Sequence, residues 1–164
     1  MQFSYAIPTG IGLITPSILY SRNFKQQISY AGRVSTIDNL GTSDGIDKYR
    51  IIGNLDFNRA DLMARLTVRY IPSYENTYGL SRQDGDFWDS DFDGVKDQPM
   101  HIGSLITYDF TTRWQATQKL TLSAGGRNIF NAKPPFALID RRPFDASRYD
   151  LRGRVVYAEA RVTF

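Results

Sequence analysis

The densest group of chemically active side chains in this sequence is the acidic run DSDFDGVKD at residues 89–97. Its carboxylates are Asp89, Asp91, Asp93 and Asp97. The first three alternate and Gly94 follows them, which is the spacing that brings oxygen ligands together around Ca²⁺ while the glycine allows a sharp turn. Met100 stands where an EF-hand loop has its bidentate glutamate, and strands are expected on both sides. The run therefore predicts either an EF-hand-like calcium site in a β protein or an acidic, solvated loop without metal.

The other polar side chains give no sign of catalysis. His101 is the single histidine and the chain has no cysteine, so neither a transition-metal site nor a thiolate site is expected. The sequence offers no serine, histidine and aspartate arrangement and no pair of carboxylates in a plausible cleft, so we expect no enzymatic activity and no required cofactor. The basic residues are spread along the chain rather than clustered, which argues against nucleic acid as a partner.

Four aromatic residues belong to the same long polar stretch as the acidic run, residues 72–103. They are Tyr74, Tyr78, Phe87 and Trp88. Aromatic rings in a long loop either contact a ligand or pack the loop on itself, and the sequence leaves both interpretations open.

The last twelve residues, GRVVYAEARVTF, predict a strand with two different faces. One face carries Val156, Ala158, Ala160, Val162 and Phe164, and the other carries Tyr157, Glu159, Arg161 and Thr163. Side chains of a strand alternate between the two sides of a sheet, so this period of two fits a half-buried strand. The apolar face ends on a terminal phenylalanine, which is typical of strands that close transmembrane barrels. A terminal strand packed into a soluble sandwich is the alternative.

Four upstream segments alternate in the same way and predict two hairpins. They are residues 47–57, 62–70, 105–114 and 120–127. Arms of nearly ten residues exceed the usual globular strand and, when tilted, are long enough to cross the hydrocarbon layer of a membrane. A further strand is expected near residues 16–21, and residues 25–37 also alternate.

The connections between the expected strands alternate in length. Residues 131–152 and 72–103 are long connections, 115–119 and 58–61 are short, and 38–45 is moderate. Outer-membrane barrels have short periplasmic turns and longer extracellular loops, so their connections alternate in length. The architecture of a sandwich does not require such an alternation. In such a barrel the lumen-facing arginines would be Arg65, Arg69, Arg113, Arg127 and Arg161, and the periplasmic aromatic girdle would be Phe57, Trp114 and Phe164. An arginine facing lipid would instead cost about 2–4 kcal/mol near the midplane.

Two stretches near the C-terminus resemble the end of TonB-dependent outer-membrane transporters. In LTLSAGGRNIFNAKPPF, residues 120–136, the family pattern N-[LI]-F-[ND]-x-x-P-P is matched by Asn128, Ile129, Phe130, Asn131, Pro134 and Pro135. In residues 149–164 the pattern Y-D-P-x-G-R is matched by Tyr149, Asp150, Gly153 and Arg154. Leu151 departs from it, because proline is common there. The resemblance is close over roughly the last sixty residues. Over the upstream hairpins it extends only to their general style and not to specific motifs.

The resemblance implies a 22-stranded barrel with an N-terminal plug domain that takes up a siderophore, cobalamin, a sugar or a similar scarce nutrient. Residues 1–164 have room for about six or seven strands and contain no recognisable plug. We therefore expect a C-terminal barrel segment of a Gram-negative outer membrane, an antiparallel meander that stays open unless missing N-terminal strands complete it. The implied partners are outer-membrane lipid and the barrel assembly machinery, for which Val162 and Phe164 belong to the terminal signal. TonB would act only through the missing plug.

Two other interpretations stay open. A complete eight-stranded outer-membrane barrel with a structural or adhesion role would fit the chain length, and it needs an eighth strand within residues 1–24 that closes on the terminal strand. A secreted calcium-binding β-sandwich would bury its apolar faces against one another. The first residues lack the features of a signal peptide, so an exported protein would have to be a mature chain or a fragment.

Overall fold

The computed structural model describes residues 1–29, 36–78, 80, 82–83, 86–87, 94–139 and 142–164. The regular elements among these residues are all β-strands, which confirms the predicted all-β fold. Within the described ranges, no helix has the length and the apolar character needed to cross a membrane.

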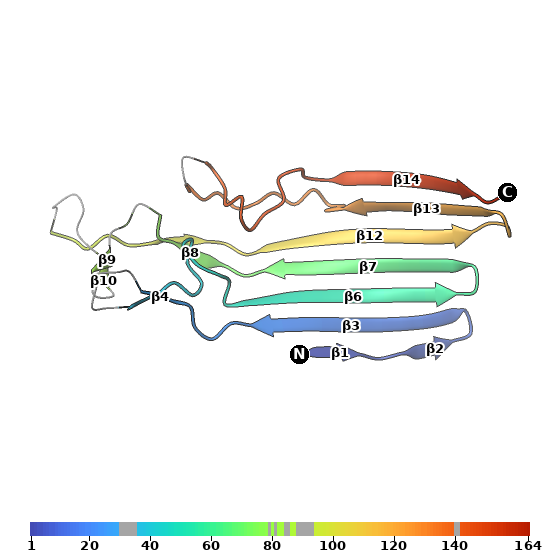
Figure 1. The fold of residues 1–164 in the computed structure, drawn as a ribbon, viewed down its shortest axis with the longest axis horizontal. Helices are drawn as coiled ribbons and strands as arrows, with labels where there is room; N and C mark the ends of the chain where they lie inside the picture. Colours follow the sequence, from blue (N-terminus) through green and yellow to red (C-terminus); the bar gives the residue numbers. More distant parts are fainter. Residues whose placement is uncertain (30–35, 79, 81, 84–85, 88–93, 140–141) are drawn as a thin grey trace.

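One antiparallel sheet contains all the long strands, and its strands lie beside one another in chain order (Figure 1). The strands are β1 (Gln2–Ser4), β2 (Ile7–Thr9), β3 (Gly12–Arg22), β6 (Tyr49–Arg59), β7 (Leu62–Ile71), β12 (Leu105–Gln115), β13 (Leu120–Arg127) and β14 (Val155–Val162). Both β1 and β2 pair with β3, so they form an interrupted edge strand beside the long strands. This arrangement is the meander of long strands that the alternation predicts.

The register gives the sheet one apolar and one polar face. A typical row of directly opposed residues on the first face is Pro16, Leu55, Leu66, Phe110, Gly126 and Val156. The neighbouring row, on the second face, is Thr15, Asp56, Arg65, Thr111, Gly125 and Tyr157. Since successive side chains point to opposite sides, each strand contributes to both faces in turn.

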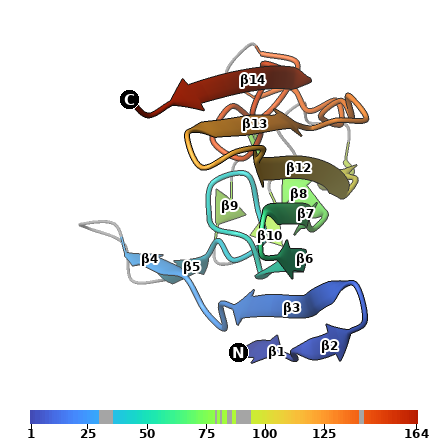
Figure 2. The same cartoon turned by 90° about the vertical axis from the view of Figure 1, so that its right-hand side faces the viewer.

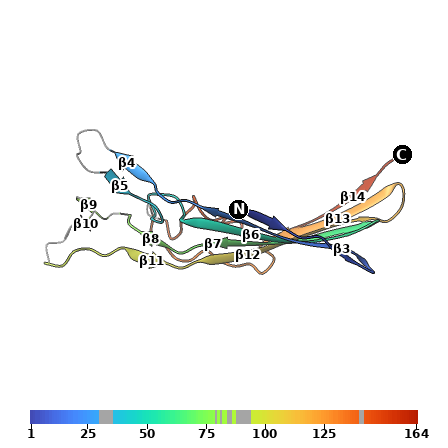
Figure 3. The same cartoon turned by 90° about the horizontal axis from the view of Figure 1, so that it is seen from below.

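The apolar face has no second layer packed on it within the described chain. Turned on edge, the sheet is a single twisted layer (Figures 2 and 3). Large side chains on this face remain exposed, among them Ile18, Leu55, Ile106, Phe110, Leu122 and Val156. A sandwich would bury such a face against a second sheet, so the sandwich alternative is not the fold of this chain.

Short connections lie at one end of the sheet and long loops at the other (Figure 1). Tight turns join β2 to β3, β6 to β7 and β12 to β13, whereas residues 23–48, 72–104 and 128–154 form the long loops. The predicted alternation of length is confirmed. It is stricter than predicted, because residues 38–45 are part of the long connection 23–48.

The described parts of residues 25–37 do not belong to the large sheet, contrary to the alternation. β4 (Gln27–Ser29) and β5 (Thr36–Asp38) pair with each other as a small ribbon within the loop. A ribbon in a loop has the same period of two as a strand of the sheet, so the pattern alone does not distinguish them. Two further ribbons lie in loop 72–104: β8 (Tyr74–Asn76) with β11 (Met100–Ile102), and β9 (Arg82–Gln83) with β10 (Asp86–Phe87).

The sheet does not close on itself. The interrupted strand β1–β2 forms one edge and β14 forms the opposite edge. Figures 1 and 2 show these edges on opposite sides of the molecule. The eight-stranded barrel would require β14 to pair with the first strand, so this alternative is also not the observed fold. Each open edge presents unpaired backbone N–H and C=O groups.

Candidate functional site

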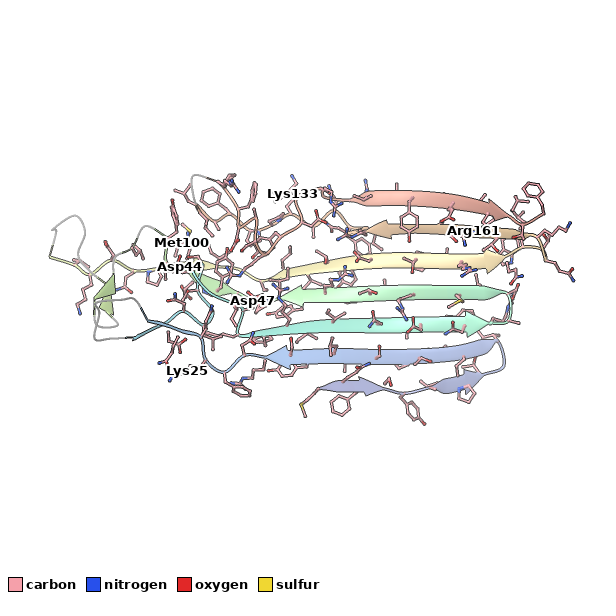
Figure 4. The ribbon with its side chains drawn as sticks, in the orientation of Figure 1. Lys25, Asp44, Asp47, Met100, Lys133 and Arg161 are labelled. Atoms are coloured by element: carbon pink, nitrogen blue, oxygen red, sulfur yellow. The ribbon has the colours of Figure 1, made fainter. Side chains whose placement is uncertain are left out.

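The polar face carries charged side chains along its whole length. The register places Arg65, Arg69, Arg113, Arg127 and Arg161 on this face. Arg65 forms an ion pair with Asp56 across β6 and β7, and Arg69 forms one with Asp109 of β12. Figure 4 labels Arg161 near the end of the sheet that carries the short turns. Charged side chains on one face of a sheet imply that this face meets water or polar groups.

Two hollows interrupt the polar face. The wider one has a volume of about 700 Å³, lies toward the short turns, and is lined by Asp56, Arg65, Arg113, Tyr157 and Glu159 among others. The smaller one, of about 210 Å³, lies where the long loop 128–154 meets the sheet. We call this smaller hollow the loop-base cavity.

Three arginines from three strands line the loop-base cavity. They are Arg50 of β6, Arg69 of β7 and Arg127 of β13. Their side chains are 55%, 44% and 51% exposed, respectively. Each guanidinium contacts one carboxylate: Arg50 contacts Asp47 at 2.7 Å, Arg69 contacts Asp109, and Arg127 contacts Asp150 at 3.1 Å.

The two carboxylates that line this cavity each accept hydrogen bonds on both oxygens. Asp109 accepts the backbone N–H of Asn128 on Oδ1 at 2.8 Å and the Arg69 guanidinium on Oδ2. Asp150 accepts Nε and Nη2 of Arg152 at 3.0 and 2.8 Å, in addition to its ion pair with Arg127. The hydrogen bonds from Arg152 hold the pKa of Asp150 well below its usual range. The cavity therefore presents carboxylates that already pair with arginines beside half-exposed guanidiniums.

Beside the loop-base cavity, Arg148 is the centre of a buried ion cluster. Its side chain is only 3% exposed, and its Nε donates to Asp47 Oδ1 at 2.8 Å while Nη1 donates to Asp145 Oδ2 at 2.5 Å. Nη2 donates to the carbonyl oxygens of Thr42 and Gly45 at 2.7 and 2.8 Å. A buried guanidinium needs such partners, because burying a charge without them is strongly unfavourable.

An apolar cluster supports the buried ions. It consists of Tyr74, Ile102, Ala137 and Tyr149, each at most 5% exposed. The Arg148 guanidinium lies over the Tyr74 ring, 4.2 Å from its centroid. The Tyr74 and Tyr149 hydroxyls are buried without a hydrogen-bond partner in the described chain, and burial raises the pKa of Tyr149 to about 12. Both phenols are consequently neutral over the physiological range.

Backbone bonds join the same loops. Ser43 N–H donates to the Glu75 carbonyl at 2.8 Å, and Glu75 N–H donates to the Gly41 carbonyl at 3.0 Å. In addition, the side-chain Nδ2 of Asn76 donates to the Leu138 carbonyl at 3.0 Å. Parts of loops 23–48, 72–104 and 128–154 thus form one packed body, which we call the three-loop unit. Figure 4 shows Asp47, one of its members, where the loops meet the sheet.

Acid is expected to open the three-loop unit. Burial alone would raise the pKa of Asp145, but hydrogen bonds from Ser147 and Arg148 outweigh it and hold the pKa below its ordinary value. A carboxyl with a lowered folded pKa contributes stability above its unfolded pKa of about 3.9 and loses it as the pH falls through the folded pKa. Hydrogen exchange at the Glu75 and Ala137 amides, corrected for the intrinsic rate, should therefore accelerate below about pH 4.

The control for this acid transition is Asp145→Asn, which removes the titrating group. The variant should exchange faster at neutral pH and lack the additional acid step at the same amides. Equal acid sensitivity in the variant and the unaltered chain would show that Asp145 is not the group responsible.

The apolar face carries aromatic rings at both ends. Near the loops, Tyr20, Tyr49 and Tyr70 are neighbours with ring centroids 6.0 Å apart in each successive pair. Tyr108 packs edge-on against Phe130 with a centroid distance of 5.1 Å. Near the short turns, this face carries Phe57 and the exposed Trp114. Between the two aromatic rows the face is predominantly aliphatic.

The predicted calcium site lies mostly outside the described residues. Asp89, Asp91 and Asp93 are not described, and Asp97 is partly buried. Within the described ranges, no group of three or more His, Cys, Asp or Glu residues could hold a metal ion. Calcium binding by residues 89–97 stays a prediction.

The four predicted loop aromatics fall into different environments. Tyr74 is buried beneath Arg148, so it packs the loop rather than facing solvent. Tyr78 is 44% exposed. Trp88 and the Phe87 side chain lie outside the described part of the chain. Val162, the last residue of edge strand β14, and Phe164 after it are both exposed.

The sequence alone does not reveal that Arg148, Asp47 and Asp145 form a unit. Asp47 and Arg148 are 101 positions apart. Asp47 is the first residue of the alternating segment 47–57, and Arg148 belongs to no alternating segment, so the pattern gives no reason to bring them together. The spacing of Asp145 and Arg148 is the only local signal, and it is common in loops. Arg50 was recognisable as a member of the charged face of its strand, but its place at the loop-base cavity depends on how loop 128–154 folds.

Comparisons with known proteins place the fold. No protein-family model matches the sequence, and no curated protein sequence matches it. Among solved structures, the chain is similar to a crystal structure of a variant of the ferric enterobactin receptor from Pseudomonas aeruginosa, with a TM-score of 0.51 and 14% identity. The match covers 99% of this chain and 22% of that chain, so the chain spans about a fifth of the receptor's length. At this identity the likeness concerns the fold.

Proposed function

We propose that this chain forms part of the barrel wall of an outer-membrane, TonB-dependent receptor that takes up a scarce nutrient. In this proposal the apolar face meets lipid, the polar face lines the lumen, and the three-loop unit lies on the extracellular side. The chain has a transport and binding role and no catalytic one. Its substrate belongs to the class of siderophores, cobalamin, sugars and similar solutes.

One observation carries the proposal: a single-layer sheet leaves an uncharged face exposed while every charged residue in the middle of its strands points the other way. A soluble protein rarely exposes an apolar surface of this extent. In a barrel wall the same surface faces lipid, and arginines on the opposite face avoid a cost of about 2–4 kcal/mol each at the midplane. The likeness to a receptor fold agrees with this orientation.

The aromatic rows and the loop lengths support the same orientation. Tyrosines near the long loops and Trp114 with Phe57 near the short turns match the two aromatic girdles at the membrane interfaces of outer-membrane barrels. Short turns would then lie in the periplasm and the long loops outside the cell. Bacterial barrels of this type have that polarity.

The two open edges indicate what the chain needs from the rest of a barrel. Unpaired N–H and C=O groups are not tolerated in lipid, so β14 and the β1–β2 edge require neighbouring strands. We infer that further strands complete the barrel, that the barrel assembly machinery recognises the terminal strand, and that TonB acts through a plug domain. Calcium in the 89–97 loop would be an additional, structural ligand.

Single-cysteine labelling on intact cells tests the proposed topology. The chain has no cysteine of its own, so each introduced thiol is a single reporter within it. Ala146→Cys, in an exposed part of the long loop, should react with a membrane-impermeant maleimide. Gln118→Cys, in the exposed turn between β12 and β13, should react only after the outer membrane is permeabilised. Val156→Cys, which is 73% exposed on the apolar face, should react only with a lipid-soluble reagent.

The three reporters also provide the controls, because all are exposed in the isolated chain and differ only in where the membrane would place them. Labelling of Gln118→Cys and Val156→Cys on intact cells at the rate of Ala146→Cys would contradict the proposal. So would recovery of the folded protein in the soluble fraction.

A further inference from the structure

The loop-base cavity has an excess of hydrogen-bond donors. A guanidinium has five N–H donors and no acceptor. Arg50, Arg69 and Arg127 each use one nitrogen in the ion pair described above, and their side chains remain about half exposed. The carboxylate oxygens of Asp109 and Asp150 are occupied by Arg69, Asn128, Arg127 and Arg152. The described chain gives the remaining N–H groups of these three arginines no further hydrogen-bond partner.

The cavity wall is rigidly built on one side. Arg148 and Tyr149 line it, and both side chains are more than nine-tenths buried in the three-loop unit. Arg148 is itself neutralised by Asp47 and Asp145, so it contributes shape rather than free charge. The other three arginines come from three strands of the same face of the sheet, and all three line this one volume.

We propose that the loop-base cavity is a binding site for a small oxyanion with two or more carboxylate or phosphate groups. Arginine suits such groups because its planar fork matches their oxygens with two parallel hydrogen bonds. Three guanidiniums around one volume favour a solute that offers an oxyanion group to more than one of them. The inference rests on the proposed function in that it gives the chemical class of solute that the polar face binds.

The size of the cavity limits the ligand. Its volume of about 210 Å³ is below the range of about 300–1,000 Å³ typical of pockets for drug-sized molecules. The site accommodates a small polyanion, or one anionic end of a larger solute. Because half of each arginine side chain is exposed, binding also depends on ionic strength.

Isothermal titration calorimetry on the protein in detergent or nanodiscs tests the inference, with citrate and pyrophosphate as anionic probes and glycerol as a neutral probe. Citrate or pyrophosphate should bind at one site, more weakly as salt is added, and glycerol should not bind. Arg127→Gln should weaken binding about 10- to 100-fold, because it removes hydrogen bonds between charged groups. This variant keeps its fold, because Asp150 retains Arg152.

Arg59→Gln is the matched control. Arg59 is 54% exposed and forms an ion pair with Asp61 at the turn between β6 and β7, outside the cavity. It has the same charge and similar exposure, so a general electrostatic effect would change both variants equally. Equal affinities in Arg127→Gln and Arg59→Gln, or equal heats for glycerol and the two anions, would overturn the inference. Neither result affects the membrane topology, so the proposed function is tested separately by cysteine labelling.

Discussion

Replacing Arg148 by methionine is expected to destabilise the three-loop unit by about 3–5 kcal/mol, the cost of removing one partner of a buried ion pair. Methionine fills a similar volume but leaves the carboxylate of Asp145 without a cation and that of Asp47 with Arg50 alone. The two carboxylate side chains are only 5% and 2% exposed. The carbonyls of Thr42 and Gly45 also lose a donor. Because 1.4 kcal/mol corresponds to a factor of ten, amide protection in this unit should fall by two orders of magnitude or more.

Native-state hydrogen exchange at Ser43, Glu75 and Ala137 measures this effect directly, since these amides donate within the unit. Arg152→Met is the matched control. Arg152 lies in the same loop and pairs with Asp150, but its side chain is 66% exposed, so an effect of at most about 1 kcal/mol is expected. Similar exchange in both variants would mean that the buried cluster does not hold the loops together.

The stability of the three-loop unit bears on binding at the loop-base cavity. Arg148 and Tyr149 belong both to the unit and to the cavity wall. A loop held in one conformation loses little conformational entropy when a ligand binds, whereas a mobile loop must be ordered at that moment. Arg148 is therefore a positioning residue, and its buried ion pairs keep one wall of the cavity preformed.

The alternation of side chains made the sheet predictable from the sequence. In β6, residues Tyr49 to Phe57 alternate between apolar and polar types, and the pairing with β7 follows from the short turn after Arg59. A period of two assigns each side chain to a face without knowledge of the rest of the fold. The same argument placed Arg65 and Arg69 together before any contact was known.

The same pattern was insufficient in the loops. Residues 27–29 and 36–38 alternate, yet they pair with each other, because strand propensity does not specify a partner. The cluster around Arg148 joins segments far apart in the chain, and its contacts depend on burial that composition does not reveal. The charged face of the sheet is therefore predictable from the sequence, and the loop-base cavity is not.

If the apolar face lies against lipid, as proposed, an arginine introduced in the middle of that face should strongly destabilise the protein. Leu55 lies in the middle of that face, opposite Pro16 and Leu66, and is 47% exposed in the isolated chain. In water, Leu55→Arg at such an exposed position would change stability little, within about 0.5 kcal/mol. In lipid the same change should lower the free energy of unfolding by about 2–4 kcal/mol, because the guanidinium lies near the midplane.

Thr15→Arg separates this effect from a general intolerance of arginine. Thr15 lies on the polar face directly opposite Asp56, the residue that follows Leu55, so the new cation gains a nearby carboxylate. We expect a change of at most about 1 kcal/mol, as for an exposed ion pair. Denaturant titration in lipid vesicles and heat-modified migration in gels compare the two variants. Equal stability of both would place the apolar face against water or protein rather than lipid, whereas a selective loss in Leu55→Arg requires a hydrocarbon environment on that face.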